Sequence, residues 1–150
     1  NAGSIRKFLR GRIQKGWRQF VIDLKGCPGI DSTFIGMLYC LASDLSEMDP
    51  AGSLEVINLG ERNERSIQNL GMDCLIRLDS NGEKWKREQE LVDENLVHPH
   101  SCAPLEKQEK TELVLEAHEA LMSANEQNRN QFCDVVEFLR KDLEAQTADN

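Results

Sequence analysis

The chain has 150 residues, of which 39% are hydrophobic and 29% charged, a composition that suits one globular domain with an appendage. Its net charge of −8 makes nucleic acid an unlikely partner on general grounds, because the neutralisation of phosphates needs a basic surface. No stretch approaches the about 20 apolar residues of a membrane-spanning helix, no secretory signal is visible, and five cysteines without a C-x-x-C pair argue against a disulfide framework and favour a reducing cytoplasm.

Residues 2–13 predict an amphipathic helix, because Ile5, Leu9 and Ile13 recur at helical spacing and basic residues lie between them. Six basic residues and no acidic one lie within residues 1–18. Such a basic face could meet an acidic partner, nucleic acid or the acidic tail of the protein itself. A solvated face opposite an apolar stripe is nevertheless the commoner explanation of this pattern.

Residues 17–24 are rich in aromatic and β-branched side chains, and their apolar run predicts a strand that is covered on both faces. A Gly-Cys-Pro-Gly loop follows, after which Asp31 can cap a buried helix from Ser32 to about residue 45. By the same criteria the next elements are a strand over residues 54–59, a polar helix over residues 61–70 and a strand over residues 74–78.

Helices and strands therefore alternate along residues 1–80, which predicts an α/β domain in this part of the chain. Short connections between them imply parallel strands joined by right-handed crossovers, with helices packed against the sheet. Cys40 and Cys74 lie in apolar runs, and we expect both to act as small hydrophobic residues of the core.

The remainder of the chain carries the whole net charge. Residues 81–150 hold eight basic and sixteen acidic residues, whereas residues 1–80 hold ten of each. We expect a charged helix and a proline-containing linker over residues 81–104, and a helical extension, either one long helix or a helical hairpin, over residues 105–150. The extension contains a heptad-like seam with a polar middle, formed by Val114, Ala117, Leu121, Ala124, Asn128, Gln131, Val135 and Phe138.

The positions of the three histidines in the sequence do not indicate a metal site or a catalytic site. His98, His100 and Cys102 bring metal-ligand types together, but a structural zinc site needs a fourth ligand, and a linker explains the stretch more simply. His118 lies among glutamates and is expected in solvent. Because all three histidines lie outside residues 1–80, we predict no nucleophile–base pair, no enzyme, and neither a metal nor a cofactor.

Residues 21–41 read V-I-D-L-K-G-C-P-G-I-D-S-T-F-I-G-M-L-Y-C-L, a strand that ends in Asp-Leu, a short loop, and Ile-Asp-Ser-Thr at the opening of an apolar helix. This run resembles the signature of the STAS (anti-sigma factor antagonist) family, and the later runs L-E-V-I-N-L and C-L-I-R-L resemble the strands that follow it. The resemblance covers residues 2–80. It departs from the family at Phe34, where the family has glycine, although Gly36 matches the second glycine of the motif.

A second departure concerns the start of the domain. The family opens with a pair of strands before its first helix, whereas residues 2–13 predict the helix directly. An uncovered edge strand favours aggregation. We therefore expect self-association, as in a homodimer, or a non-standard sheet edge.

The resemblance implies a cytoplasmic module of a bacterial signalling assembly that regulates transcription by switching partners. Its partners would be an anti-sigma factor, which is a serine kinase of the histidine-kinase-like ATPase class, and a serine phosphatase. By motif position Ser32 is the phosphorylated residue and Thr33 the second choice. The partner-binding surface implied by the motif consists of Asp31, Ser32, Thr33, Phe34 and Gly36.

An electrostatic argument that does not depend on the resemblance also supports a switch at Ser32. We expect its hydroxyl to be exposed at the start of a buried helix, where backbone N–H groups favour an added phosphate carrying roughly −1.5 to −2 charges. The neighbouring Asp31 and any docked partner would oppose that charge. Two alternatives remain: the triplet is only a helix cap, or the domain is an oligomerisation scaffold in which Ser32 is never modified.

Overall fold

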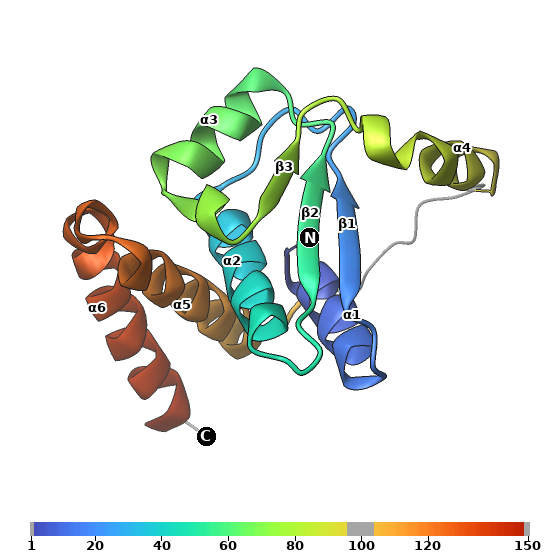
Figure 1. Cartoon of the computed structure of the whole chain (residues 1–150). Helices are drawn as coiled ribbons and strands as arrows, with labels where there is room; N and C mark the ends of the chain where they lie inside the picture. The colour runs from blue at the N-terminus through green and yellow to red at the C-terminus, as the bar shows by residue number, and fades with distance from the viewer. Residues whose placement is uncertain (1, 96–103, 149–150) are drawn as a thin grey trace.

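The computed structural model describes residues 2–95 and 104–148 and has an α/β architecture around a three-stranded parallel sheet (Figure 1). The order in the sheet is β1-β2-β3. The strands are β1 (Gln19–Asp23), β2 (Ser53–Ile57) and β3 (Arg77–Asp79). In the register of the sheet, Val21 lies beside Glu55, and Glu55 lies beside Arg77. The parallel alternation predicted for residues 1–80 is confirmed.

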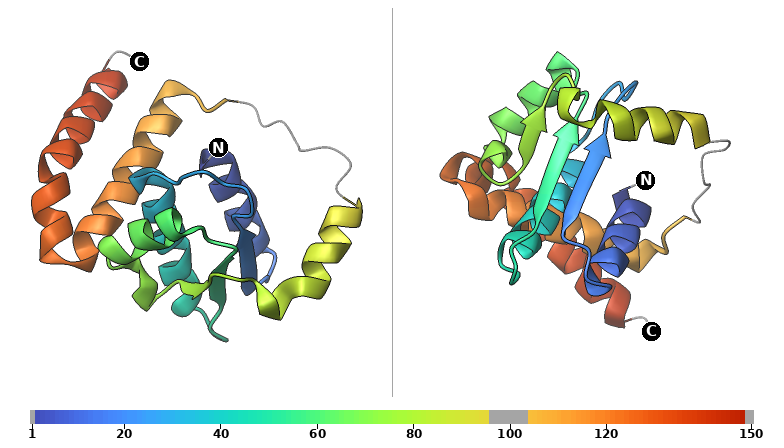
Figure 2. Two further views of the ribbon diagram at one scale, coloured as in Figure 1. Left: turned by 90° about the horizontal axis from the view of Figure 1, so that it is seen from above. Right: turned by 45° about the vertical axis from the view of Figure 1, so that its right-hand side comes forward.

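Helices lie on both sides of the sheet but are concentrated on one. They are α1 (Ala2–Gln14), α2 (Ser32–Ser46), α3 (Glu61–Asn69), α4 (Lys86–Asn95), α5 (Lys107–Ala124) and α6 (Glu126–Ala148), with the 3-10 turns η1 (Met72–Cys74) and η2 (Glu83–Trp85). α1 and α2 lie against one face, α5 packs on the outer side of α2, and α6 runs beside α5 (Figures 1 and 2). α4 projects from the opposite side near the carboxyl ends of the strands (Figure 2).

α2 is the centre of the molecule. It lies between the sheet and α5, which explains why its sequence is apolar on most sides. Leu38, Leu41 and Leu45 are at most 1% exposed, as are the inward-facing Leu54 and Val56 of β2. A helix with this composition could not remain at the surface, and burial on two sides removes its apolar area from water.

The third strand is shorter and later than predicted. Gly71 has φ 68°, the left-handed conformation that glycine adopts at little cost, and it turns the chain into η1 before β3 begins. This turn buries Met72 and leaves Cys74 exposed. The expectation that Cys74 belongs to the core was therefore wrong, and Cys40 is only half-buried.

The C-terminal extension is a hairpin, one of the two forms predicted for it. The chain breaks at Asn125, whose backbone is extended with φ −160°. The side-chain Oδ1 of Asn125 accepts a hydrogen bond from the N–H of Asn128 at 2.8 Å, which caps the start of α6. The Nδ2 of Asn128 donates to the carbonyls of Leu70 and Leu121, and so ties the hairpin turn to the end of α3.

The break changes which side of α6 is buried. The predicted seam continued through Val135 and Phe138, but these side chains are 40% and 68% exposed. Phe132 and Val136 face the interior instead. The spacing of three and four residues holds only within one continuous helix, and the extended residue at position 125 resets it.

Two further expectations concern the linker before this extension and membrane-spanning helices. Most of the predicted linker lies outside the described residues, together with His98, His100 and Cys102. None of the helices within residues 2–95 and 104–148 has an apolar stretch sufficient to cross a lipid bilayer.

Candidate functional site

The predicted junction between strand and helix forms at Asp31 and Ser32. Asp31 is the N-cap of α2, with φ −97° and ψ 172°, and its Oδ1 accepts a hydrogen bond from the N–H of Phe34 at 2.8 Å. The capping role that the sequence offered to Asp31 is therefore present. Ser32 is the first residue of the helix, so its own hydroxyl is not used as the cap.

The Ser32 hydroxyl contacts the C-terminal hairpin and the residue is half-buried, so the expectation that the hydroxyl is exposed was wrong. Its Oγ lies 3.0 Å from Nε2 of His118, 86 residues away on α5. The prediction that no hydroxyl of the α/β part pairs with a histidine was therefore wrong, because the fold brings α5 back against α2. Nδ1 of the same ring lies 2.7 Å from the carbonyl oxygen of Val114. Because a carbonyl oxygen only accepts, Nδ1 carries the proton, and a neutral ring then leaves Nε2 to accept from Ser32.

The ring of His118 is buried and packs against α6. The residue is 5% exposed, and its ring meets the ring of Phe132 on α6 edge to face, with centroids 5.0 Å apart. The prediction that His118 is solvated was wrong. The glutamates beside it in sequence point elsewhere on α5, and the hairpin turn brings Phe132 against the imidazole.

Two further contacts bring α5 close to the α/β part. Gly36 lies so near to α5 that a Cβ atom there would stand 2.3 Å from the carbonyl oxygen of Ala117. Glu116 accepts from the guanidinium groups of both Arg6 and Arg10 on α1. The basic helix thus contacts the protein's own acidic tail, one of the outcomes considered for it, and α5 is held against both α1 and α2.

Other residues of the predicted binding surface differ in accessibility. Asp31 is exposed, Thr33 and Phe34 are half-buried, and Phe34 packs against the core. Gly36 is covered by α5 in this structure. Asp31 and Thr33 line a shallow depression together with Lys110 of α5, whereas neither Ser32 nor His118 lines it.

Cys40 lies on the same helix but does not offer a reactive thiolate. Burial, followed by the negative charges of Glu116 and Asp44, raises the pKa of Cys40 to about 11. Burial likewise raises the pKa of Asp44. The thiol of Cys40 stays protonated at neutral pH, and only the thiolate is a good nucleophile.

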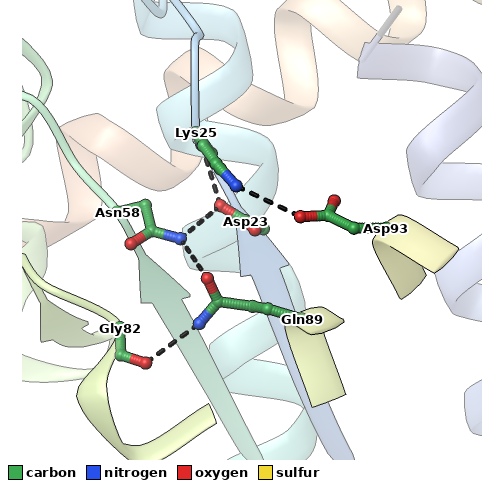
Figure 3. Close-up of polar contacts among 6 residues, drawn as sticks. All are labelled: Asp23, Lys25, Asn58, Gly82, Gln89 and Asp93. Carbon is green, nitrogen blue, oxygen red and sulfur yellow. Dashed lines mark hydrogen bonds and ion pairs between the residues drawn. The ribbon is translucent and has the colours of Figure 1, made fainter. Parts of the chain in front are cut away.

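A second polar cluster lies at the carboxyl ends of β1 and β2, where α/β proteins often bind ligands (Figure 3). Asn58, with φ 53°, donates from Nδ2 to Asp23 at 2.8 Å and to Gln89 at 2.9 Å. Gln89 donates in turn to the carbonyl of Gly82, and Lys25 pairs with Asp93. These groups satisfy one another and fix α4 to the sheet, which explains the cluster without a ligand.

Metal ligands do not gather anywhere in the described ranges. No group of three or more histidine, cysteine, aspartate or glutamate side chains within residues 2–95 and 104–148 is arranged to hold a metal ion. The His98, His100 and Cys102 hypothesis falls on residues outside these ranges.

Comparisons with known proteins return no match: no family model, no curated protein and no solved structure is similar to the chain. The resemblance to the STAS signature therefore depends on the motif in residues 21–41 and on the order of the elements around it.

Sequence reasoning identified Ser32 but missed its partner. The signal for His118 was weak, because a histidine among glutamates is usually solvated. The neighbouring positions Leu113, Ala117 and Leu121 do mark the buried side of α5. His118 lies one residue after Ala117, at the border of that stripe, and could have been assigned to the packed side on this ground.

Proposed function

We propose that this chain is a phospho-regulated protein–protein interaction module of the STAS type, which exchanges partners according to the state of Ser32. The observation that best supports this proposal is the 3.0 Å contact between Ser32 and His118 at the amino end of α2. The Ser32 oxygen is one of the groups that link the α/β part to the hairpin, beside the Arg6 and Arg10 pairs with Glu116. A modification of that oxygen therefore acts on two parts of the molecule at once.

A phosphate on Ser32 would disrupt this contact. The phosphorylated oxygen no longer has a proton to donate to Nε2, and the phosphate brings roughly −1.5 to −2 charges into the space between α2 and α5. The helix dipole of α2 would stabilise that charge, while the exposed carboxylate of Asp31 would oppose it. The α/β core, centred on the buried leucines of α2, would remain intact.

Access to the hydroxyl requires a movement of α5. Ser32 is half-buried and directs its Oγ at a buried imidazole, so a kinase cannot reach it while His118 stays in place. The hairpin thus protects Ser32 in this state. Detachment of α5 would expose Ser32 and the surface of α2 around Gly36 together, and it would remove the α5 side of the depression that Asp31 and Thr33 line.

The partners that fit this proposal are those implied by the resemblance. A serine kinase of the histidine-kinase-like ATPase class, acting as an anti-sigma factor, would bind the unmodified module, and a serine phosphatase would restore it. The module itself would act in the cytoplasm, catalyse no reaction and need no cofactor.

Phosphorylation kinetics test the proposal. The chain and three variants, Ser32→Ala, Thr33→Ala and His118→Ala, are incubated with ATP and candidate kinases encoded beside its gene, and the products are mapped by mass spectrometry. We expect one phosphate on Ser32, none in Ser32→Ala, an unchanged rate in Thr33→Ala and a faster rate in His118→Ala. A phosphate confined to Thr33, or none with the kinase that binds the chain, contradicts the proposal.

A binding measurement separates the switch from damage to the fold. Ser32→Asp should weaken the complex with the unmodified-state partner while the melting temperature changes little. Ser32→Ala serves as the control, because it removes the hydroxyl without adding charge. Equal binding by wild type and Ser32→Asp would argue against a charge-dependent switch.

The main alternative is a scaffold in which the contact is permanent. The hydrogen bond between Ser32 and His118 is satisfied and half-buried, as an ordinary packing contact between helices would be. In that case Ser32 stays unmodified with every partner. A hydrolase is a poorer alternative despite the serine–histidine pair, because neither residue lines the depression beside them.

A further inference from the structure

The face of the sheet opposite α1 and α2 is only partly covered. The side chains of Gln19, Val21 and Asp23 on β1 alternate with the inward-facing Phe20 and Ile22, and they point to this open face. The turn η2 and helix α4 cover its carboxyl end, and no other described element covers its amino end (Figures 1 and 2).

An apolar strip runs along this open face. Two adjoining hollows share Val21 and Trp85: one extends to Trp17 before β1, and the other to Val92 on α4. Trp17 is 57% exposed and Val92 is 55% exposed. Exposed tryptophan beside exposed aliphatic side chains is typical of interface centres, where aromatic residues supply much of the buried area.

The two ends of the strip carry opposite charges. At the amino end, Arg18 lines the hollow beside Trp17, and the exposed Lys15 precedes Trp17 by two residues in the chain. Nη1 of Arg18 donates to the carbonyls of Ile13 and Trp17, whereas its Nε is buried without a hydrogen bond within the described residues. At the carboxyl end, Asp23, Glu88 and Asp93 line the hollow around Val92, and Lys25 pairs with Asp93.

The middle of the strip holds one buried carboxylate, Glu55, between the basic side chains of Lys84 and Arg77. Glu55 receives hydrogen bonds from Lys84 at 2.7 Å and from the ring N–H of Trp85 at 2.6 Å. Burial acts to raise the pKa of Glu55, but these two donors and the charge of Arg77 outweigh it and hold that pKa below its ordinary value. Trp85 is thereby fixed at the centre of the open face.

We propose that this open face is the interface of a symmetric dimer of two copies of the chain, with the twofold axis close to Val21 and Trp85. A twofold axis at the centre places the basic end of each copy against the acidic end of the other. Trp17 of one copy then reaches the hollow around Val92 of its partner. Opposite charges then face each other at both ends of the interface, and Trp17 of each copy is removed from water.

The opposed ends also distinguish a second copy from other occupants. Nucleic acid or an anionic membrane would be attracted to Lys15 and Arg18 but repelled by Asp23, Glu88 and Asp93. A basic peptide would be attracted to the acidic end of the strip but repelled by the basic end. Only a partner whose charge changes sign along its length matches the whole strip, and the chain itself is such a partner.

Charge reversal at each end tests the interface with the full chain. The amino-end variant is Lys15→Glu/Arg18→Glu, and the carboxyl-end variant is Glu88→Lys/Asp93→Lys. Sedimentation velocity over a concentration series should show a wild-type dimer and a dissociation constant raised about tenfold or more in each variant alone. A one-to-one mixture of the two variants should restore the dimer, because each then offers the charge that the other lacks.

Controls keep the test independent of folding. Lys107→Glu/Lys110→Glu makes the same charge change on α5, on the other side of the sheet, and should dimerise as wild type does. Thermal melting checks that each variant is folded. If Arg18→Glu unfolds the turn before β1, Trp17→Ser replaces that variant and should also give monomers. A monomeric wild type at high concentration, or a mixture that stays monomeric, overturns the proposal.

Discussion

The face of the sheet that carries α1 and α2 is buried under a further layer of helices, whereas the opposite face is covered only by η2 and α4 near the carboxyl ends of the strands. On the covered side, close contacts join residues that are far apart in sequence, such as Ser32 with His118 and Gly36 with Ala117. On the open side, Trp17 and Val92 remain largely exposed.

This difference between the two faces indicates which contacts can change while the α/β core stays folded. The leucines of α2 are needed for any folded state, because they fill the centre of the core. The contacts of α5 with α2 include polar groups, the Ser32 hydroxyl and the His118 ring, and a chemical change at these groups can weaken the attachment. The open face, in contrast, can gain a partner without losing any contact that the monomer already makes.

The largest effect should come from Gly36→Ala on the covered side. The new Cβ would stand 2.3 Å from the carbonyl oxygen of Ala117, so α5 must shift or detach, at a cost of about 3 kcal/mol of unfolding free energy. Urea unfolding measures this loss, and hydrogen exchange should show faster exchange in α5. Gly11→Ala is the matched control, since nothing lies within 4 Å of its Cβ, and it should be stabilising by about 0.5–1 kcal/mol.

His118→Ala should rank second. It removes a buried ring that contacts Phe132 and leaves the Ser32 hydroxyl without its acceptor, which should cost about 2 kcal/mol. The loss should appear in equilibrium unfolding, with faster amide exchange in α5 and α6 and little change in the strands. Uniformly faster exchange across the sheet would mean that the hairpin cannot open independently.

Ser32→Ala should have a smaller effect on stability. It deletes the hydrogen bond to Nε2 of His118 while the packing of the ring stays, so we expect a loss of about 1 kcal/mol. Thr33→Ala is the matched control at the next position and keeps the His118 contact. If the two variants lose equal stability, the Ser32 contact adds nothing to the attachment of α5.

The smallest effect concerns Glu55 on the open face and depends on pH. Its pKa is lowered from the ordinary value of 4.5, so the stability it contributes is complete above that value and is lost as the pH falls through the lower pKa of the folded state. The difference in unfolding free energy between wild type and Glu55→Gln should therefore shrink as the pH falls below 4.5. Glu137→Gln, in an exposed pair with Lys141, should show a smaller dependence.

Local signals in the sequence were sufficient for the α/β part. Apolar runs with turn residues between them predicted the parallel strands, and the Asp31 cap lies where the preference for aspartate at helix starts put it. The exceptions came from single turns. Gly71 delayed the third strand and exposed Cys74, and the extended Asn125 reset the buried side of α6.

The sequence by itself determined the order of the elements and the location of Ser32 at the start of a buried helix, because both follow from interactions between residues close together in the chain. Only the tertiary structure decided that His118 meets Ser32 and that one face of the sheet stays open. Those outcomes depend on how the hairpin docks, and docking is set by shape and burial across 86 residues of separation, which no local pattern encodes.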